Sequence, residues 1–264
     1  MRRTNLAIPF IALIMMISTT LHADIRTETI EYSVEGQPHT GYIAWDDSIN
    51  RQRPGILVVH EWWGHNAFAR NQAEKLAEAG YTALALDMYG EGKTAEHPEK
   101  AEAFMKEANS NMVKMKARFR TAMQRLQNHD TVDAQQIAAQ GYCFGGGVVL
   151  NMARSGMDLD GVVSFHGSLG SPVEAEAGAV KARIQVYTGG ADQFVPANQV
   201  AGFVKEMQNA GAEYRVRSFP GVKHSFMNPG ADEYAEEFDM PIAYDEQAAE
   251  AAWQGAMRFY EDIF

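Results

Sequence analysis

Cys143 is the only cysteine in the 264-residue chain, and it lies within the glycine-rich segment Gly141-Tyr142-Cys143-Phe144-Gly145-Gly146. An apolar run at 137–139 precedes this segment, and a helical pattern follows it. Small residues on both sides of a nucleophile permit the strand-to-helix turn called a nucleophile elbow, which is familiar as G-x-S-x-G. Here a thiol replaces the hydroxyl. The segment therefore predicts a thiolate that attacks an ester or lactone carbonyl.

A carboxylate and an imidazole follow Cys143 in the order that an α/β-hydrolase triad requires. Asp192 follows the glycine turn at 189–190, and His224 lies in Gly221-Val222-Lys223-His224-Ser225-Phe226, each after a predicted strand. An imidazole can take the thiol proton, and a carboxylate can fix its tautomer. Asp87 also follows a strand and competes with Asp192, which has the better glycine turn. Alternatively, Cys143 is an inert buried residue.

The segment His60-Glu61-Trp62-Trp63-Gly64-His65 superficially resembles a zinc-binding H-E-x-x-H motif. Its second histidine is one position too far along, and the segment follows a strand rather than forming a helix, so no metal site is predicted. The loop after this strand commonly supplies an oxyanion-hole amide, the other being the N–H after the nucleophile. Trp62 and Phe144 are accordingly predicted to be the two backbone donors.

Three further residues are predicted to line the substrate pocket, because each lies just after a predicted strand. They are Trp63, Tyr89 and His166. An aromatic pocket of this kind suits an apolar substrate. Packing of the tryptophans in the core is the open alternative.

Short apolar runs alternate with helical patterns along the chain, which is typical of an α/β fold with a parallel sheet covered on both faces. Ligands bind such sheets at the carboxyl ends of the strands. Residues 25–34 and 39–45 alternate apolar and polar, which predicts a hairpin at a sheet edge. The buried strands are predicted at 55–59, 82–86, 137–139, 162–165 and 184–187, a later edge strand at 214–219, and the clearest helices at 112–126 and 249–260.

The first 23 residues have the pattern of a cleavable signal peptide, with Arg2 and Arg3 before an apolar run at 6–17. We therefore expect a periplasmic or secreted protein with no membrane association after cleavage; an uncleaved anchor is the alternative. Residues 24–264 have a suitable length for a single domain. The net charge of −11 becomes more negative on cleavage, which argues against nucleic acid as a partner.

The chain resembles the dienelactone hydrolase family of α/β-hydrolases. The resemblance implies a Cys143–Asp192–His224 triad, no cofactor, and a position for Glu61 beside the resting thiol, where it influences thiol ionisation. It rests on His60-Glu61-Trp62-Trp63-Gly64, Asn66-Ala67-Phe68-Ala69-Arg70, Leu86-Asp87-Met88-Tyr89, Gly141-Tyr142-Cys143-Phe144-Gly145-Gly146, Gly189-Gly190-Ala191-Asp192 and Gly221-Val222-Lys223-His224-Ser225-Phe226.

Two positions depart from the family pattern. The family's best-known members bind the dienelactone carboxylate with two arginines, and Glu91 and Asn228 stand at the matching places here. Lys93 is near enough to replace the first arginine, whereas nothing basic replaces the second. Anionic dienelactone is therefore not the expected substrate.

These features together predict an exported hydrolase that cleaves a small ester or lactone through a thioester acyl-enzyme. A catalytically silent protein that binds an apolar small molecule in the same fold is the principal alternative. A peptidase ranks behind both. The sequence leaves the physiological substrate open, as well as the choice between monomer and homodimer.

Overall fold

The computed structural model describes residues 24–171 and 173–264, so the predicted signal peptide at 1–23 lies outside the described residues. All eight strands join one sheet, in the order β1-β2-β4-β3-β5-β6-β7-β8. Their bounds are β1 Ile25–Val34, β2 Gln37–Asp46, β3 Arg53–Val59, β4 Thr82–Leu86, β5 Val132–Tyr142, β6 Gly161–Phe165, β7 Arg183–Gly189 and β8 Tyr214–Phe219.

The sheet is mostly parallel, and its antiparallel part is the predicted hairpin. Strands β1 and β2 pair antiparallel at one edge, and β2 pairs antiparallel with β4. The remaining neighbours, from β4 through β3 to β8, are parallel. The predicted α/β-hydrolase architecture with an N-terminal hairpin at one edge is confirmed. Strand β8 forms the opposite edge, as its alternating pattern predicts.

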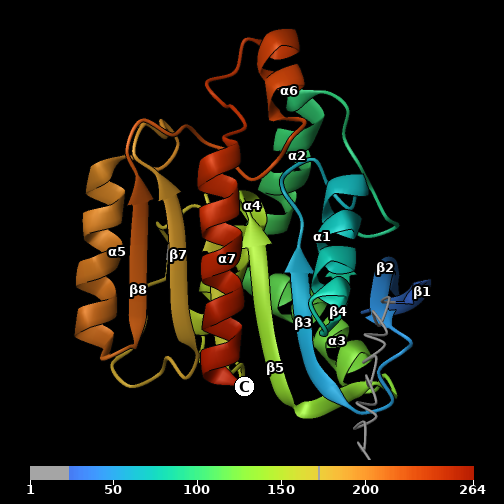
Figure 1. The fold of residues 1–264 in the computed structure, drawn as a ribbon. Helices are drawn as coiled ribbons and strands as arrows, with labels where there is room; N and C mark the ends of the chain where they lie inside the picture. Colours follow the sequence, from blue (N-terminus) through green and yellow to red (C-terminus); the bar gives the residue numbers. More distant parts are fainter. Residues whose placement is uncertain (1–23, 172) are drawn as a thin grey trace, which may run out of the picture.

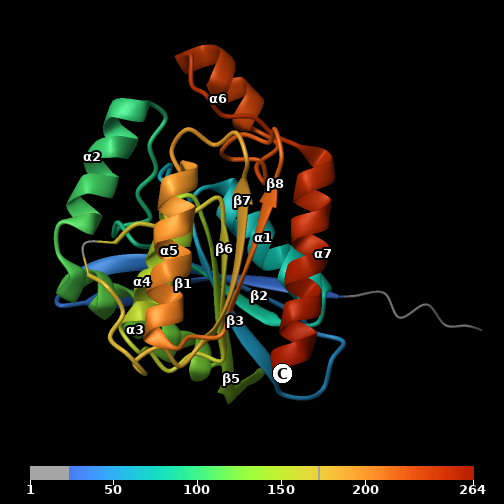
Figure 2. The same ribbon diagram turned by 90° about the vertical axis from the view of Figure 1, so that its left-hand side faces the viewer.

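Seven helices complete the described part of the chain: α1 Ala67–Glu78, α2 Pro98–Asn109, α3 Met112–Gln127, α4 Phe144–Arg154, α5 Ala197–Ala210, α6 Ala231–Phe238 and α7 Glu246–Ile263. Figure 2 shows the sheet nearly edge-on, with α3, α4 and α5 on one face and α1 and α7 on the other. Side-chain caps begin several of them; Asn66, Asn111 and Asp245 accept backbone N–H bonds at the starts of α1, α3 and α7.

Both faces of the sheet are buried, which explains the continuous apolar runs in the sequence. Every residue of β4 and β6 is buried. One apolar cluster packs the sheet against α3, α4 and α5, and a second packs it against α1 and α7. The predicted helices at 112–126 and 249–260 correspond to α3 and α7, each extended by a few residues.

Helix α6 lies beyond the carboxyl ends of the strands, and α2 is found at the same end of the molecule (Figure 1). The turns that follow β3, β5, β7 and β8 all lie at this carboxyl end of the sheet. None of the helices in the described residues combines the length and apolar character that crossing a membrane requires.

Candidate active site

Cys143 occupies a strained turn between β5 and α4. Its φ of 52° and ψ of −114° lie outside the regions that non-glycine residues ordinarily adopt. The turn needs glycine on both sides, because a methyl group on Gly141 would overlap the Gly145 carbonyl oxygen, and one on Gly145 would approach the His60 carbonyl oxygen to 2.6 Å. The glycine pattern thus produces an elbow that presents the thiol, which is partly exposed, at the strand end.

Asp192 and His224 lie together, as their spacing predicts. Asp192 follows β7, His224 follows β8, and His224 Nδ1 is 2.7 Å from Asp192 Oδ2. The other carboxylate oxygen, Oδ1, accepts the backbone N–H bonds of Phe194 and Val195 at 2.8 and 3.1 Å. Asp192 is therefore fixed by its own loop while it orients the imidazole.

His224 has a high proton affinity. Burial opposes its charging, but the charge of the neighbouring Cys143 and the hydrogen bonds to Asp192 and Cys143 outweigh burial and raise the pKa of His224 to about 10. Cys143 and His224 also line the same cavity. The three predicted triad residues therefore meet at one place.

Asp87, the alternative candidate for the triad carboxylate, instead accepts hydrogen bonds from backbone N–H groups around the turn after β4. Its Oδ1 accepts N–H bonds from Tyr89 and Gly90, and its Oδ2 accepts them from Gly92 and Thr40. These bonds order the turn after β4. Asp192 is the carboxylate that pairs with His224.

Trp62 lies on the loop after β3, and Phe144 is the first residue of α4, directly after Cys143. Gly145 N–H donates to the His60 carbonyl at 3.1 Å, which joins the loop after β3 to the start of α4. Within residues 24–171 and 173–264, neither the Trp62 N–H nor the Phe144 N–H donates to a protein acceptor. Both amides therefore remain available to a ligand oxygen.

Glu61 is buried beside the triad, with an exposed fraction of 2%. Asn228 Nδ2 donates to its Oε2 at 2.6 Å, whereas its Oε1 has no protein partner among the described residues. Burial raises the pKa of Glu61 to about 7, although the hydrogen bond from Asn228 and the charge of His224 act in the opposite direction. Asn228, which the sequence marks only as a missing arginine, is thus the direct partner of this carboxyl.

A cavity of about 450 Å³ opens onto Cys143 and His224. Its walls are mostly apolar and include four methionines from α2, α3 and the segment after α6. The described residues that line it are Trp62, Glu102, Met105, Asn109, Met112, Met115, Cys143, Phe144, Gly147, Asn151, Ser168, Gly170, Phe194, Val195, His224, Ser225, Met240 and Ile242.

The prediction that Trp63, Tyr89 and His166 line the pocket requires correction, because none of the three is in the cavity wall. Trp63 packs against Tyr234 of α6, with ring centroids 4.1 Å apart. The Tyr89 hydroxyl donates to the Trp62 carbonyl at 3.0 Å. A residue at a strand end can face away from the ligand, and the sequence contains no signal for that direction.

His166 lies beneath the elbow rather than in the cavity. Its Nδ1 accepts the Cys143 N–H at 3.1 Å, and its ring packs edge-on against that of His224. Burial keeps the pKa of His166 well below its usual value, so this imidazole is neutral. Its contacts indicate a role in supporting the elbow.

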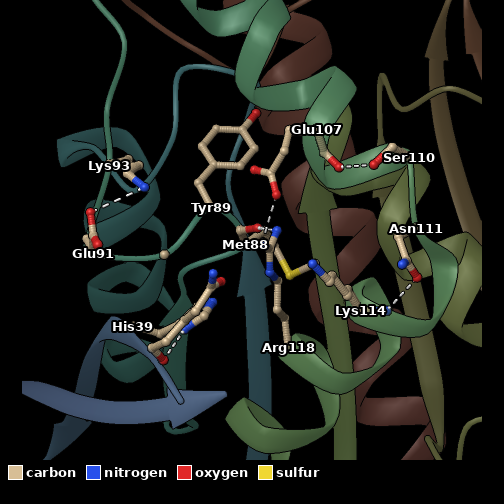
Figure 3. Close-up of polar contacts among 12 residues, drawn as sticks. His39, Met88, Tyr89, Glu91, Lys93, Glu107, Ser110, Asn111, Lys114 and Arg118 are labelled. Carbon is tan, nitrogen blue, oxygen red and sulfur yellow. Dashed lines mark hydrogen bonds and ion pairs between the residues drawn. The ribbon is translucent and has the colours of Figure 1, made fainter. Parts of the chain in front are cut away.

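Lys93 does not take the place of a substrate-binding arginine. Its ammonium pairs with Glu91 at 3.2 Å on an exposed loop, as Figure 3 shows, and it is absent from the cavity wall. The wall contains methionines of α2 and α3, and those of α3, Met112 and Met115, have the spacing of an ordinary core stripe. Only the placement of these helices over the elbow distinguishes the two possibilities.

Known proteins resemble this chain over most of its length. The model of the dienelactone hydrolase family matches residues 40–264. The chain is 28% identical to the protein named usf of Aquifex pyrophilus, over 89% of this chain and 98% of that protein, and 27% identical to a putative carboxymethylenebutenolidase of Aquifex aeolicus, over 89% and 97%.

Solved structures of dienelactone hydrolase-like proteins also superpose on this chain. A dienelactone hydrolase-like promiscuous phosphotriesterase from metagenomic libraries superposes with a TM-score of 0.86 at 26% identity, covering 92% of this chain and 100% of that one. A putative dienelactone hydrolase from Klebsiella pneumoniae superposes with a TM-score of 0.76, covering 90% and 98%; at 22% identity it supports the fold.

Proposed function

The chain belongs to the dienelactone hydrolase family of ester and lactone hydrolases, and on this premise we propose that Cys143 is its nucleophile. In this proposal His224 is the general base and acid, and Asp192 orients it. The observation that carries the proposal is the 2.7 Å hydrogen bond between His224 and Asp192, at a cavity that Cys143 also lines. The substrate is a small uncharged ester or lactone.

The reaction proceeds in two halves. His224 takes the proton of Cys143, and the thiolate forms a bond to the carbonyl carbon, moving an electron pair onto the carbonyl oxygen. The N–H groups of Trp62 and Phe144 stabilise that oxyanion. The intermediate collapses to a thioester as the alkoxide leaves with the proton from His224. Water, deprotonated by His224, then attacks the thioester, and the released thiolate regains the proton.

The high proton affinity of His224 supports the first half. An imidazole that is strongly stabilised in its charged form by Asp192 and the thiolate favours the ion pair that makes a thiol nucleophilic. The thioester then forms most readily from esters with good leaving groups, because the tetrahedral intermediate expels a thiolate easily unless the other group leaves readily.

The charge of the cavity supports a neutral substrate. Among the described residues that form its wall there is no lysine or arginine, and its acidic residue, Glu102, is paired with Lys106 at 2.6 Å. Asn228 stands where the family's second arginine would be and is engaged with Glu61. An anionic dienelactone would therefore lose its carboxylate hydration without gaining an ion pair.

The test is hydrolysis of p-nitrophenyl acetate by the purified protein. We expect turnover that Cys143→Ala abolishes and that iodoacetamide blocks in proportion to the thiol labelled. Undiminished turnover by Cys143→Ala would refute the mechanism. Labelling at the rate of an ordinary thiol, with no turnover on a panel of neutral esters and lactones, would instead favour the silent binding protein.

We propose in addition that residues 1–23 are a cleavable signal peptide and that the mature protein is periplasmic or secreted. The arginine pair followed by an apolar run supports this. Expression of the full chain in a Gram-negative host, cell fractionation and mass determination of the product provide the test. A product that retains residues 1–23 in the membrane fraction would contradict it.

A further inference from the structure

We propose that His60 is a positioning residue for the oxyanion hole: its neutral imidazole orients the peptide group between Glu61 and Trp62, so that the Trp62 N–H faces the substrate oxygen. This inference rests on the proposed function. It gives a role to a buried imidazole that the triad does not use and that lies next to the elbow in space.

Both ring nitrogens of His60 have fixed partners. His60 Nδ1 is 2.6 Å from the Glu61 carbonyl oxygen, and Nε2 is 3.2 Å from the Met88 backbone nitrogen. A carbonyl can only accept and a backbone N–H can only donate, so Nδ1 carries the proton and Nε2 accepts. Only the neutral Nδ1–H tautomer satisfies both bonds.

The bond at Nδ1 determines where the Trp62 N–H points. The Glu61 carbonyl and the Trp62 N–H belong to one planar trans peptide, in which C=O and N–H point in opposite directions. His60 Nδ1–H and Gly64 N–H, at 3.2 Å, both donate to that carbonyl. The Trp62 N–H is therefore directed away from His60, and it has no protein acceptor among the described residues.

The backbone of His60 relates this donor to the second one. The His60 carbonyl accepts the Gly145 N–H at 3.1 Å, and Gly145 directly follows Phe144, whose N–H is the other donor. The His60 ring also packs against the rings of Tyr89 and Phe144, with centroids 4.7 and 5.8 Å away. One residue thus links the two amides through its carbonyl and its side chain.

Burial keeps His60 in the required protonation state. The residue is fully buried, and burial lowers the pKa of His60 to about 4, against the opposing effects of the Glu61 carbonyl and Asp87. A protonated ring would place an Nε2–H against the Met88 N–H. The neutral form therefore persists across the range in which a hydrolase of this kind is assayed.

Two substitutions separate the two bonds of the ring. Asn places an amide N–H at the position of Nδ1, so His60→Asn keeps the donor to the Glu61 carbonyl and loses the acceptor for Met88. Gln places a carbonyl oxygen near Nε2, so His60→Gln keeps the acceptor and loses the donor. Each variant is compared with the wild type in turnover of p-nitrophenyl acetate, in the rate of alkylation by iodoacetamide, and in the urea midpoint of unfolding.

We expect His60→Gln to lower kcat by about 10- to 100-fold with little change in KM. Complete removal of one oxyanion donor typically costs about 10²- to 10³-fold, and this variant keeps the Trp62 N–H but loses the bond that orients it. Its alkylation rate should stay within about twofold of wild type, since displacement of iodide builds no oxyanion and needs no such donor. His60→Asn should retain most of kcat and unfold at lower urea, because the Met88 N–H is left unpaired.

Turnover of His60→Gln at the wild-type rate would overturn the proposal. So would a parallel loss of turnover and alkylation in His60→Gln, which would indicate a general disturbance of the site. Failure of the proposed function is separately visible, because it appears as activity in Cys143→Ala whatever the His60 variants do.

Discussion

Glu61 and Asn228 form a buried pair in which one partner can ionise and the other cannot. An arginine in place of Asn228 would bring a full positive charge and favour the carboxylate strongly, whereas the amide offers one hydrogen bond. The Asn228 side chain cannot turn freely, because its Oδ1 accepts the Gly230 N–H at 2.9 Å while its Nδ2 donates to Glu61. A neutral partner of fixed orientation leaves Glu61 close to its titration point near pH 7.

We predict that Glu61→Gln stabilises the protein at pH 8 but not at pH 5. The folded-state pKa of Glu61 is raised from 4.5 to about 7, so between these values the folded state binds more protons and wild-type stability falls as pH rises. The gain on replacement should approach roughly 3 kcal/mol at most, as a shift of this size implies. Glutamine retains an oxygen for Asn228.

Urea unfolding at the two pH values measures this difference. Glu174→Gln, which removes an exposed carboxylate, is the matched control and should show little dependence on pH. An equal effect of Glu61→Gln at pH 5 and pH 8 would mean that the carboxyl does not titrate in this interval.

The connection from β5 to α4 shows how one short segment produces the nucleophile's position. Helix α4 begins with Phe144, which three glycines follow although glycine is a poor helix former, and the helix is buried along almost its whole length. Two of these glycines are required by close contacts: Gly145 lies against the backbone of β3, and Gly146 lies against Gly167 after β6. The start of α4 therefore contains residues of low helix propensity, because only glycine fits between the neighbouring strand ends at this point.

A pair of substitutions on α4 should have opposite effects on stability. Gly145→Ala forces a methyl group against the carbonyls of Val59 and His60 and should cost about 2 kcal/mol or more. Gly147→Ala meets its nearest neighbour, the Ser168 carbonyl oxygen, at 3.4 Å, so it should stabilise by about 0.5–1 kcal/mol through helix propensity. Thermal and urea unfolding of both variants provide the comparison; destabilisation of similar size in both would contradict the assignment of the close contact to Gly145.

The substrate cavity is assembled from segments that are distant in the chain. Its wall takes residues from the loop after β3, from α2 and α3, from the elbow, and from the turns after β7 and β8. The segment that contains α6 closes one side, since Met240 and Ile242 line the cavity and the Ala243 N–H donates to the His224 carbonyl at 3.1 Å. Stacking of Tyr234 on Trp63 connects α6 to the rest of the molecule.

We predict that Tyr234→Ala loosens α6 and weakens substrate binding more than chemistry. Loss of the stacked ring removes apolar contact with Trp63 and, since such a ring pair contributes about 0.5–1.5 kcal/mol beyond its buried area, should lower local stability. KM for a bulky neutral ester should rise several-fold. Hydrogen exchange should become faster in 231–242 and stay unchanged in α4. Tyr234→Phe keeps the stacking and is the control; an effect as large as that of alanine would refute the role of the ring.

The class of fold and the chain order of the candidate triad residues follow from the sequence alone. Apolar runs buried on both faces identify parallel strands, and the glycines around Cys143, before Asp192 and before His224 mark turns at strand ends. Because parallel strands bring their carboxyl ends to one edge, chain order alone predicts that these three residues meet. The hairpin, α3 and α7 were predictable for the same reason, since their periodicity follows from which side faces the core.

Which side chains face the substrate cavity depends on how the elements pack against one another. Three residues that follow strands, Trp63, Tyr89 and His166, are absent from the cavity wall. Met112 and Met115, whose spacing is that of a core stripe, are part of the wall. Contacts such as Glu61 with Asn228, which are 167 residues apart, leave no trace in local spacing. Periodicity specifies the face of an element that is buried, but the direction and neighbours of each side chain depend on how the elements pack in three dimensions.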